Sequence, residues 1–113
     1  MNDAEVMLTT LVSLAALDGH IDDTEFAVLV RLCLEWKVPT SLLKTIVAEV
    51  KQGKTKIKLP QDSALRMKLF GALLRVTMAD GVVHDMERLI LYRVGSRLDL
   101  DKERVDDLIK GVP

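Results

Sequence analysis

A short acidic motif occurs twice in this sequence, and its carboxylates are the most concentrated chemistry in the chain. The first copy runs from Asp18 to Glu25, and the second runs from Asp80 to Glu87, 62 residues later. Both read Asp-Gly-x-[Ile/Val]-x-Asp-x-Glu. Carboxylates at this density can hold a hard cation, and they can also cap a helix. A cation needs several carboxylates to converge on one point, whereas a cap needs a carboxylate at the start of its own helix.

The first copy fits helix capping well. Asp22 is a favourable N-cap residue, and Glu25 three positions later completes the pattern of a capping box. Ile21 before the cap and Phe26 after it have the spacing of a hydrophobic staple. Gly19 is suited to end the preceding helix, because glycine adopts the left-handed conformation at low cost. Capping alone would therefore account for most of this copy.

The second copy fits capping less well, because His84 stands where the first copy has the capping Asp, and Arg88 stands where it has Phe. Asp18 and Asp80 also lie near the C-terminal end of an expected helix, where a carboxylate opposes the helix dipole. A favourable contact close to each carboxylate must therefore offset its repulsion by the helix dipole. A hydrogen bond across the turn to the free N–H groups of the next helix would provide it, and so would a cation.

The motif resembles the second half of an EF-hand calcium loop. In that register Asp18 takes loop position five, Gly19 position six and Glu25 position twelve. Positions one and three are then Leu14 and Ala16, which cannot ligate a hard cation. A standard EF-hand is therefore excluded.

An incomplete oxygen shell remains, which could bind Ca²⁺ or Mg²⁺ weakly with water completing the coordination sphere. If the two turns come together, they form one shared acidic site. The candidate metal ligands are Asp18, Asp22, Glu25, Asp80, Asp85 and Glu87. His20 and His84 would add imidazoles that admit a transition metal. Pure capping and an acidic face for a protein partner are the two alternatives.

The repeat extends beyond the motif, since residues 11–38 align without gaps with residues 73–100. Two copies are too few for a solenoid and suit one domain with pseudo-twofold symmetry. Apolar periodicity predicts an all-α, compact six-helix bundle. The expected helices cover 3–17, 23–37, 39 onward, 63–79, 84–98 and 101 onward. They form two three-helix halves, 1–51 and 62–113, joined by a linker at 52–61.

Several details accompany this expected fold. Thr40 or Ser41 could cap the third helix, and Ile57 and Leu59 of the linker should pack against the core. The composition is 49% hydrophobic but only 4% aromatic, so aliphatic side chains must fill that core. Cys33, the only cysteine, excludes an internal disulfide and is expected to be an inert core thiol.

Charge and motif content limit the function classes. The net charge is −1, and Phe70 is the only aromatic residue in the basic stretch between Lys51 and Arg75, so we expect no nucleic-acid partner. The chain lacks the sequence motifs of nucleophilic, phosphate-binding and zinc-hydrolase sites, so we expect no enzyme. Asp3 and Glu5 argue against a secretory signal, and no apolar run approaches the ~20 residues of a membrane span. We therefore expect a cytoplasmic protein, with peripheral membrane association left open.

The duplicated motif resembles that of the TerB-like family, which includes the tellurite-resistance TerB domain and a related N-terminal domain of DnaJ-like co-chaperones. The resemblance rests on Ala-Leu-Asp18-Gly19-x-Ile-x-x-x-Glu25 and Met-Ala-Asp80-Gly81-x-Val-x-x-x-Glu87. It implies a helical bundle, an acidic face proposed to bind metal, and a role in bacterial stress responses. The acidic positions that it carries over are the first and last of each motif.

Two functional hypotheses follow. The first is a non-enzymatic bacterial stress-response accessory protein, in which a bound divalent cation orders the acidic turns. The second is a protein–protein interaction module, working with co-chaperone or membrane-associated partners, whose acidic motifs are only helix caps. A protein partner is expected in either case, and a homodimer is left open.

Overall fold

The computed structural model describes residues 2–112, and these form an all-α bundle without strands. Six α-helices and one short 3₁₀ helix follow one another along the chain. They are α1 (Asp3–Ala15), η1 (Ala16–Asp18), α2 (Asp23–Glu35), α3 (Thr40–Lys51), α4 (Ser63–Thr77), α5 (Asp85–Arg97) and α6 (Lys102–Lys110). The predicted fold class is confirmed.

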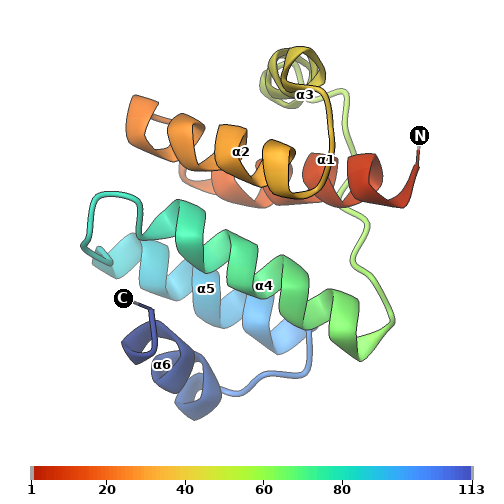
Figure 1. Ribbon diagram of the computed structural model, residues 1–113. Coiled ribbons are helices and arrows are strands. Elements are labelled where there is room, and N and C mark those ends of the chain that lie inside the picture. Colours follow the sequence, from red (N-terminus) through yellow and green to blue (C-terminus); the bar gives the residue numbers. More distant parts are fainter. Residues whose placement is uncertain (1, 113) are drawn as a thin grey trace.

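The helices are arranged in layers. In Figure 1, α1 and α2 lie above α4 and α5, with α3 on the top of the bundle and α6 at the bottom. Helix α4 packs against both α1 and α2, and α3 packs on the same two helices from the other side. The α1–α2 and α4–α5 connections lie at the same end of the bundle, on the left in Figure 1. This layering brings the two acidic motifs near each other.

Aliphatic side chains fill the core, as the composition predicts. Leu29 of α2 and Leu91 of α5 are completely buried, and so are Leu11 of α1 and Phe70 of α4. Burial of such side chains is the main favourable term in folding. Cys33 is buried among them as expected, and burial raises the pKa of its thiol.

Local geometry repeats at the spacing of the sequence repeat. Gly19 and Gly81 both have positive φ, 104° and 82°, in the turns that precede α2 and α5. Lys37 and Asp99 follow α2 and α5 with φ of 57° and 64°, again in the left-handed region. Helices α2 and α5 also have the same length. The local part of the duplication is therefore evident, whereas a twofold relation between the complete halves stays a prediction.

Several details differ from the sequence-based expectations, and α2 and α4 each end two residues earlier than expected. The first helix changes to 3₁₀ geometry at Ala16 rather than continuing as an α-helix to residue 17. Pro39 is the N-cap of α3, at φ −58° and ψ 132°, and no side chain caps this helix, so neither Thr40 nor Ser41 has that role. In the linker, Leu59 packs against the core, but Ile57 is 46% exposed.

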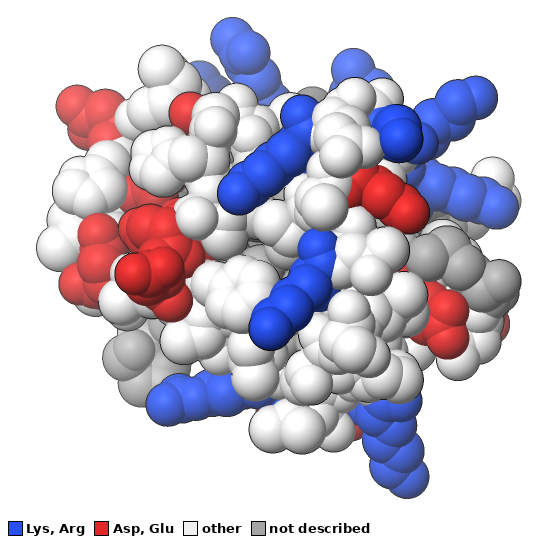
Figure 2. Space-filling model, turned by 90° about the horizontal axis from the view of Figure 1, so that it is seen from above, with Lys and Arg blue, Asp and Glu red and all other residues white. Residues whose placement is uncertain are grey.

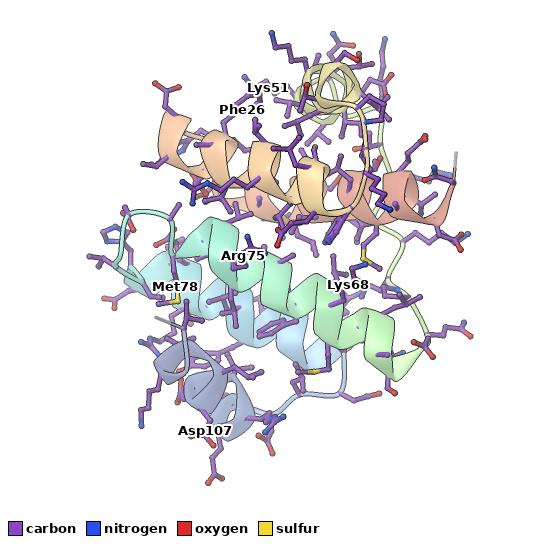
Figure 3. The ribbon with its side chains drawn as sticks, in the orientation of Figure 1. Phe26, Lys51, Lys68, Arg75, Met78 and Asp107 are labelled. Atoms are coloured by element: carbon purple, nitrogen blue, oxygen red, sulfur yellow. The ribbon has the colours of Figure 1, made fainter. Side chains whose placement is uncertain are left out.

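The basic residues of α4 contact neighbouring helices and loops. Figure 3 labels Lys68 and Arg75 on this helix. The Lys68 ammonium lies 5.2 Å from the centre of the Trp36 ring, and Arg75 forms a 2.8 Å ion pair with Glu35 of α2. These contacts account for Lys68 and Arg75 without a polyanionic partner. Among the described residues, no helix is long and apolar enough to cross a membrane.

Candidate cation site

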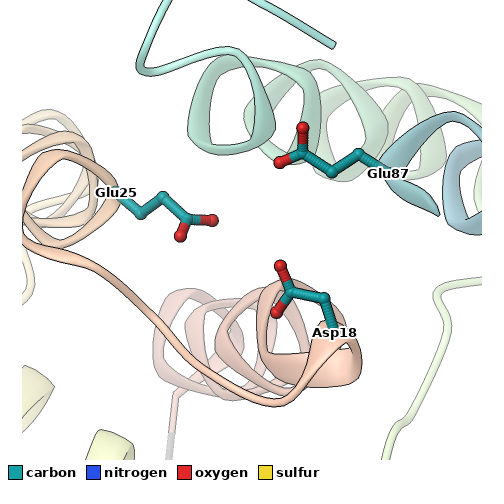
Figure 4. A group of neighbouring side chains, drawn as sticks. All are labelled: Asp18, Glu25 and Glu87. Carbon is teal, nitrogen blue, oxygen red and sulfur yellow. The ribbon is translucent and has the colours of Figure 1, made fainter. Parts of the chain in front are cut away.

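Three carboxylates from the two motif copies meet at one end of the bundle. Asp18 belongs to η1, Glu25 to the first turn of α2, and Glu87 to the first turn of α5. One oxygen from each lies within 4.8 Å of the other two. Figure 4 shows the three side chains converging from three separate elements. The cluster thus joins two residues of the first copy to one residue of the second.

Reciprocal capping positions Glu25. Its backbone N–H donates to Asp22 Oδ1 at 2.8 Å, and the Asp22 N–H donates to Glu25 Oε1 at 3.2 Å. The predicted capping box is therefore confirmed in the first copy. Because one oxygen of Glu25 serves the cap, the carboxylate is fixed at the helix start while it still faces the cluster.

Glu87 is positioned by the corresponding contact in the second copy. The His84 N–H donates to Glu87 Oε1 at 2.9 Å. The His84 ring lies on the other side of its turn, with Nε2 3.2 Å from Asp80 Oδ2. Asp80 also accepts the backbone N–H of Val82 at 3.0 Å. That backbone bond, followed by the interaction with His84, lowers the pKa of Asp80.

The two motif aspartates are compensated within their own turns rather than by the next helix. Asp18 Oδ1 accepts the His20 N–H at 3.3 Å, as Asp80 does from Val82. This bond spans two residues, which is the pattern of an Asx-turn. Of the two compensations that the sequence left open, the hydrogen bond is therefore present, but it comes from the turn's own amides and not from the start of the following helix.

The remaining predicted ligands lie outside the cluster. Asp22 uses Oδ1 to cap α2 and to accept the Thr24 hydroxyl, and these bonds lower its pKa. Asp85 lies in the first turn of α5. Among residues 2–112, the group with converging ligand atoms includes neither of these two nor Asp80, His20 or His84. Of the six predicted carboxylates, three therefore converge on one site.

The electrostatics of the cluster centre on Glu25. This residue is only 7% exposed, whereas most carboxylates of the motif are open to solvent. Burial, together with the negative charges of Asp22, Asp18 and Glu87, raises the pKa of Glu25 to about 7. The Asp22 N–H opposes this change only in part. A proton or another cation is therefore held favourably at this position near neutral pH.

The donor set consists of carboxylate oxygens alone, which suits a hard cation better than a transition metal. Ca²⁺ accepts oxygen ligands in a flexible geometry, whereas Mg²⁺ demands a near-ideal octahedron. Three carboxylates that approach from separate elements therefore suit Ca²⁺ better than Mg²⁺. Water would have to supply the remaining ligands.

Figure 2 shows the surroundings of the bundle from above. Asp and Glu side chains gather at one edge of this face, whereas Lys and Arg side chains project separately over the rest of it.

Comparisons of the chain with protein-family models, with curated proteins and with solved structures gave no match. The geometry described above is therefore the basis for any functional proposal.

Sequence reasoning placed Asp18, Glu25 and Glu87 among the candidate ligands, but it did not predict which carboxylates would meet. The symmetric expectation was an incomplete shell of three carboxylates in each copy, or all six together. The signal that could have distinguished Glu25 was its neighbour Phe26, an apolar residue that is partly buried against the core. The second copy has Arg88 in that place, and its guanidinium instead binds Asp106 at 2.8 Å.

Proposed function

We propose that this chain is a non-enzymatic accessory protein of the TerB-like kind, acting in a bacterial stress response through a divalent cation bound by Asp18, Glu25 and Glu87. The observation that carries the proposal is the convergence of these carboxylates from η1, α2 and α5 within 4.8 Å. Like charges at such distances repel one another unless a proton or a cation lies between them. Ca²⁺ is the cation that we expect, because it tolerates an irregular shell of oxygen ligands.

Such a cation would act on the fold as well as on the site. It would tie the first motif copy to the second, because its ligands come from both. A ligand that binds only the folded state stabilises it by about 2.7 kcal/mol at 100 times its Kd. The acidic end of the bundle would then be ordered in a cation-dependent way, and a partner could recognise that ordered state.

Calorimetric titration of chelator-treated protein with Ca²⁺, Mg²⁺, Mn²⁺ and Zn²⁺ tests the proposal. We expect Ca²⁺ to bind with one site per chain and to raise the Tm, and we expect Glu25→Gln with Glu87→Gln to abolish both effects. Asp80→Asn is the matched control, because Asp80 occupies the same motif position as Asp18 but lies outside the cluster. Equal loss in the control, or no heat with any ion in the wild type, would contradict the proposed site.

The second candidate function is a protein interaction module in which the motifs are only caps. The reciprocal bonds between Asp22 and Glu25 favour it, since they account for these two residues without a ligand. In that case divalent ions should not change the Tm, and Asp22→Ala should destabilise the protein more than Asp18→Asn. The same titration series therefore separates the two candidates.

A further inference from the structure

A second surface, which adjoins the first acidic motif but is not lined by the three cluster carboxylates, combines apolar and basic side chains. Two adjoining hollows of about 300 and 370 Å³ open next to each other, and both are lined by Leu17 and Ile57. The first extends between the linker and α5, and the second between η1, α3 and the linker. We call the two hollows together the Leu17–Ile57 groove.

The apolar part of this groove is unusually accessible. Leu17 is 52% exposed and Ile57 is 46% exposed, although both are large aliphatic side chains. Buried Leu14 and Val94 lie beneath them in the first hollow. Contiguous exposed apolar surface with a hollowed shape is typical of an interaction site rather than of an ordinary solvated face. The sequence predicted that Ile57 would be buried, and its exposure is explained if another molecule covers it.

The charged residues of the groove all have the same sign. Arg93 and Arg97 of α5 line the first hollow, and Lys51 of α3 lines the second. Neither hollow is lined by an Asp or a Glu. Within residues 2–112, no carboxylate lies within 4.0 Å of these three cationic groups. The other arginines of α4 and α5, Arg66, Arg75 and Arg88, each have a carboxylate partner.

We propose that the Leu17–Ile57 groove binds an acidic amphipathic segment of a partner protein. Apolar side chains of the segment would enter the two hollows on either side of the Leu17 and Ile57 side chains. Its carboxylates would pair with Arg93, Arg97 and Lys51, because charges across an interface are arranged to complement one another. The mode is that of an amphipathic helix lying in an apolar groove.

The shape of the surface favours a protein segment over a lipid surface. The basic linker residues Lys54, Lys56 and Lys58 are exposed near Ile57 and would also attract anionic lipid. A bilayer, however, takes up apolar groups that protrude, whereas here Leu17 and Ile57 border recessed surface. Recesses accept the side chains of a folded segment. This inference does not depend on the proposed cation site.

The experiment uses the full chain, immobilised in EDTA so that no divalent cation contributes. A displayed library of random 16-residue peptides is selected against it, and enriched sequences are synthesised for fluorescence anisotropy. We expect the enriched peptides to be rich in Asp and Glu, with at least two large apolar residues. Arg93→Glu with Arg97→Glu should weaken their binding at least tenfold, and so should Leu17→Ser.

Two matched controls lie outside the groove. Arg31 occupies the position in α2 that Arg93 occupies in α5, so Arg31→Glu makes the same charge change at the equivalent site. Leu34 is another exposed leucine, so Leu34→Ser makes the same change in polarity away from the groove. Both should bind within twofold of the wild type. If the double Arg variant fails to fold, Arg93→Gln with Arg97→Gln and the Leu17 variant decide the matter.

Several outcomes would overturn the proposal. These are no enrichment at all, enrichment of neutral or basic peptides, or equal binding by the groove variants and the wild type. Vesicles of phosphatidylcholine and phosphatidylserine (7:3) serve as a parallel probe. Groove-dependent binding to vesicles, with no acidic peptide enriched, would assign the surface to a membrane instead. Self-association that the groove variants abolish, with no peptide competing, would assign it to a second copy of the chain.

Discussion

At the residue scale, the surroundings of Glu25 change the pKa of its carboxylate in opposite directions. Its Oε1 accepts the Asp22 N–H, which favours the charged form. Its burial and the nearby charges of Asp18 and Glu87 disfavour that form and raise its pKa to about 7. The raised pKa means that the folded protein binds this proton more tightly than the unfolded chain does. Stability must therefore depend on pH through this residue.

The pH dependence has a definite sign. Between the ordinary pKa of 4.5 and the folded value of about 7, the folded state holds more protons than the unfolded state, so stability falls as pH rises through this window. The full loss is at most ~3 kcal/mol, from ~1.4 kcal/mol per pKa unit. Glu25→Gln removes the titration but keeps an oxygen that can accept the Asp22 N–H.

We therefore expect Glu25→Gln to be more stable than the wild type at pH 8 in EDTA, by about 1–3 kcal/mol, and nearly equal to it at pH 4.5. Urea denaturation at both pH values measures the difference. Glu49→Gln is the control, because it makes the same exchange in a helix at a position that is only half-buried. A Glu25→Gln protein that is less stable than the wild type at pH 8 would contradict the account of the cluster.

At the element scale, the two halves use the same local geometry but pack their helices differently. Gly95 of α5 stands where α2 has Cys33. A Cβ atom on Gly95 would lie 2.7 Å from Val105 Cγ2 of α6, so the glycine permits the close approach of these two helices. Gly71 of α4 offers a contrast, because a Cβ atom there would meet nothing within 4 Å.

These two glycines should respond to alanine in opposite ways. Gly71→Ala should stabilise the protein by about 0.5–1 kcal/mol, because alanine loses less conformational entropy in a helix. Gly95→Ala should destabilise it by about 1–3 kcal/mol, because the new methyl group must displace Val105. The free energy of unfolding in urea measures both. Gly95→Ala combined with Val105→Ala should recover part of the loss, and a stabilising Gly95→Ala would show that α6 can move away freely.

At the scale of the whole molecule, one continuous core joins all six helices. Buried residues of α1, α2, α4 and α5 form a single cluster with Leu43 of α3 and Val105 of α6. Helix α4 is central, since it contacts α1, α2 and α5. A shared core of this kind predicts one cooperative unfolding transition rather than separate transitions for the two halves.

A core substitution in either half should therefore destabilise both halves together. Leu29→Ala and Leu91→Ala should each cost about 2–5 kcal/mol, because both side chains are completely buried. Trp36, the only tryptophan, reports on the first half by fluorescence, while far-UV circular dichroism reports on all helices. For both variants the two signals should shift together in urea. Leu91→Ala could instead lower the urea midpoint followed by ellipticity and leave the midpoint followed by Trp36 fluorescence unchanged. That result would show that the two halves unfold independently.

Much of this architecture could be predicted from the sequence, because the forces involved are local. Apolar periodicity predicted the six helices, and Gly19 predicted the turn after the first of them, since few other residues adopt positive φ at low cost. The capping box was also predictable, because its donors and acceptors are only three residues apart. The shorter α1 and the exposed Ile57 were not, since both depend on how the linker and η1 lie against the rest of the bundle.

Only the tertiary structure decided which carboxylates meet. The two motif copies are nearly equivalent in sequence, and either could have formed a pair of its own. Packing of α2 and α5 against α4, and of α5 against η1, brings Glu87 to Asp18 and Glu25, while Asp80 interacts with His84. Burial of Glu25, and therefore its raised pKa, also arises only from that packing. The sequence by itself determined the candidate ligands and the helices that carry them, because residue type and spacing are local. Distances between residues far apart in the chain depend on how those helices share one core.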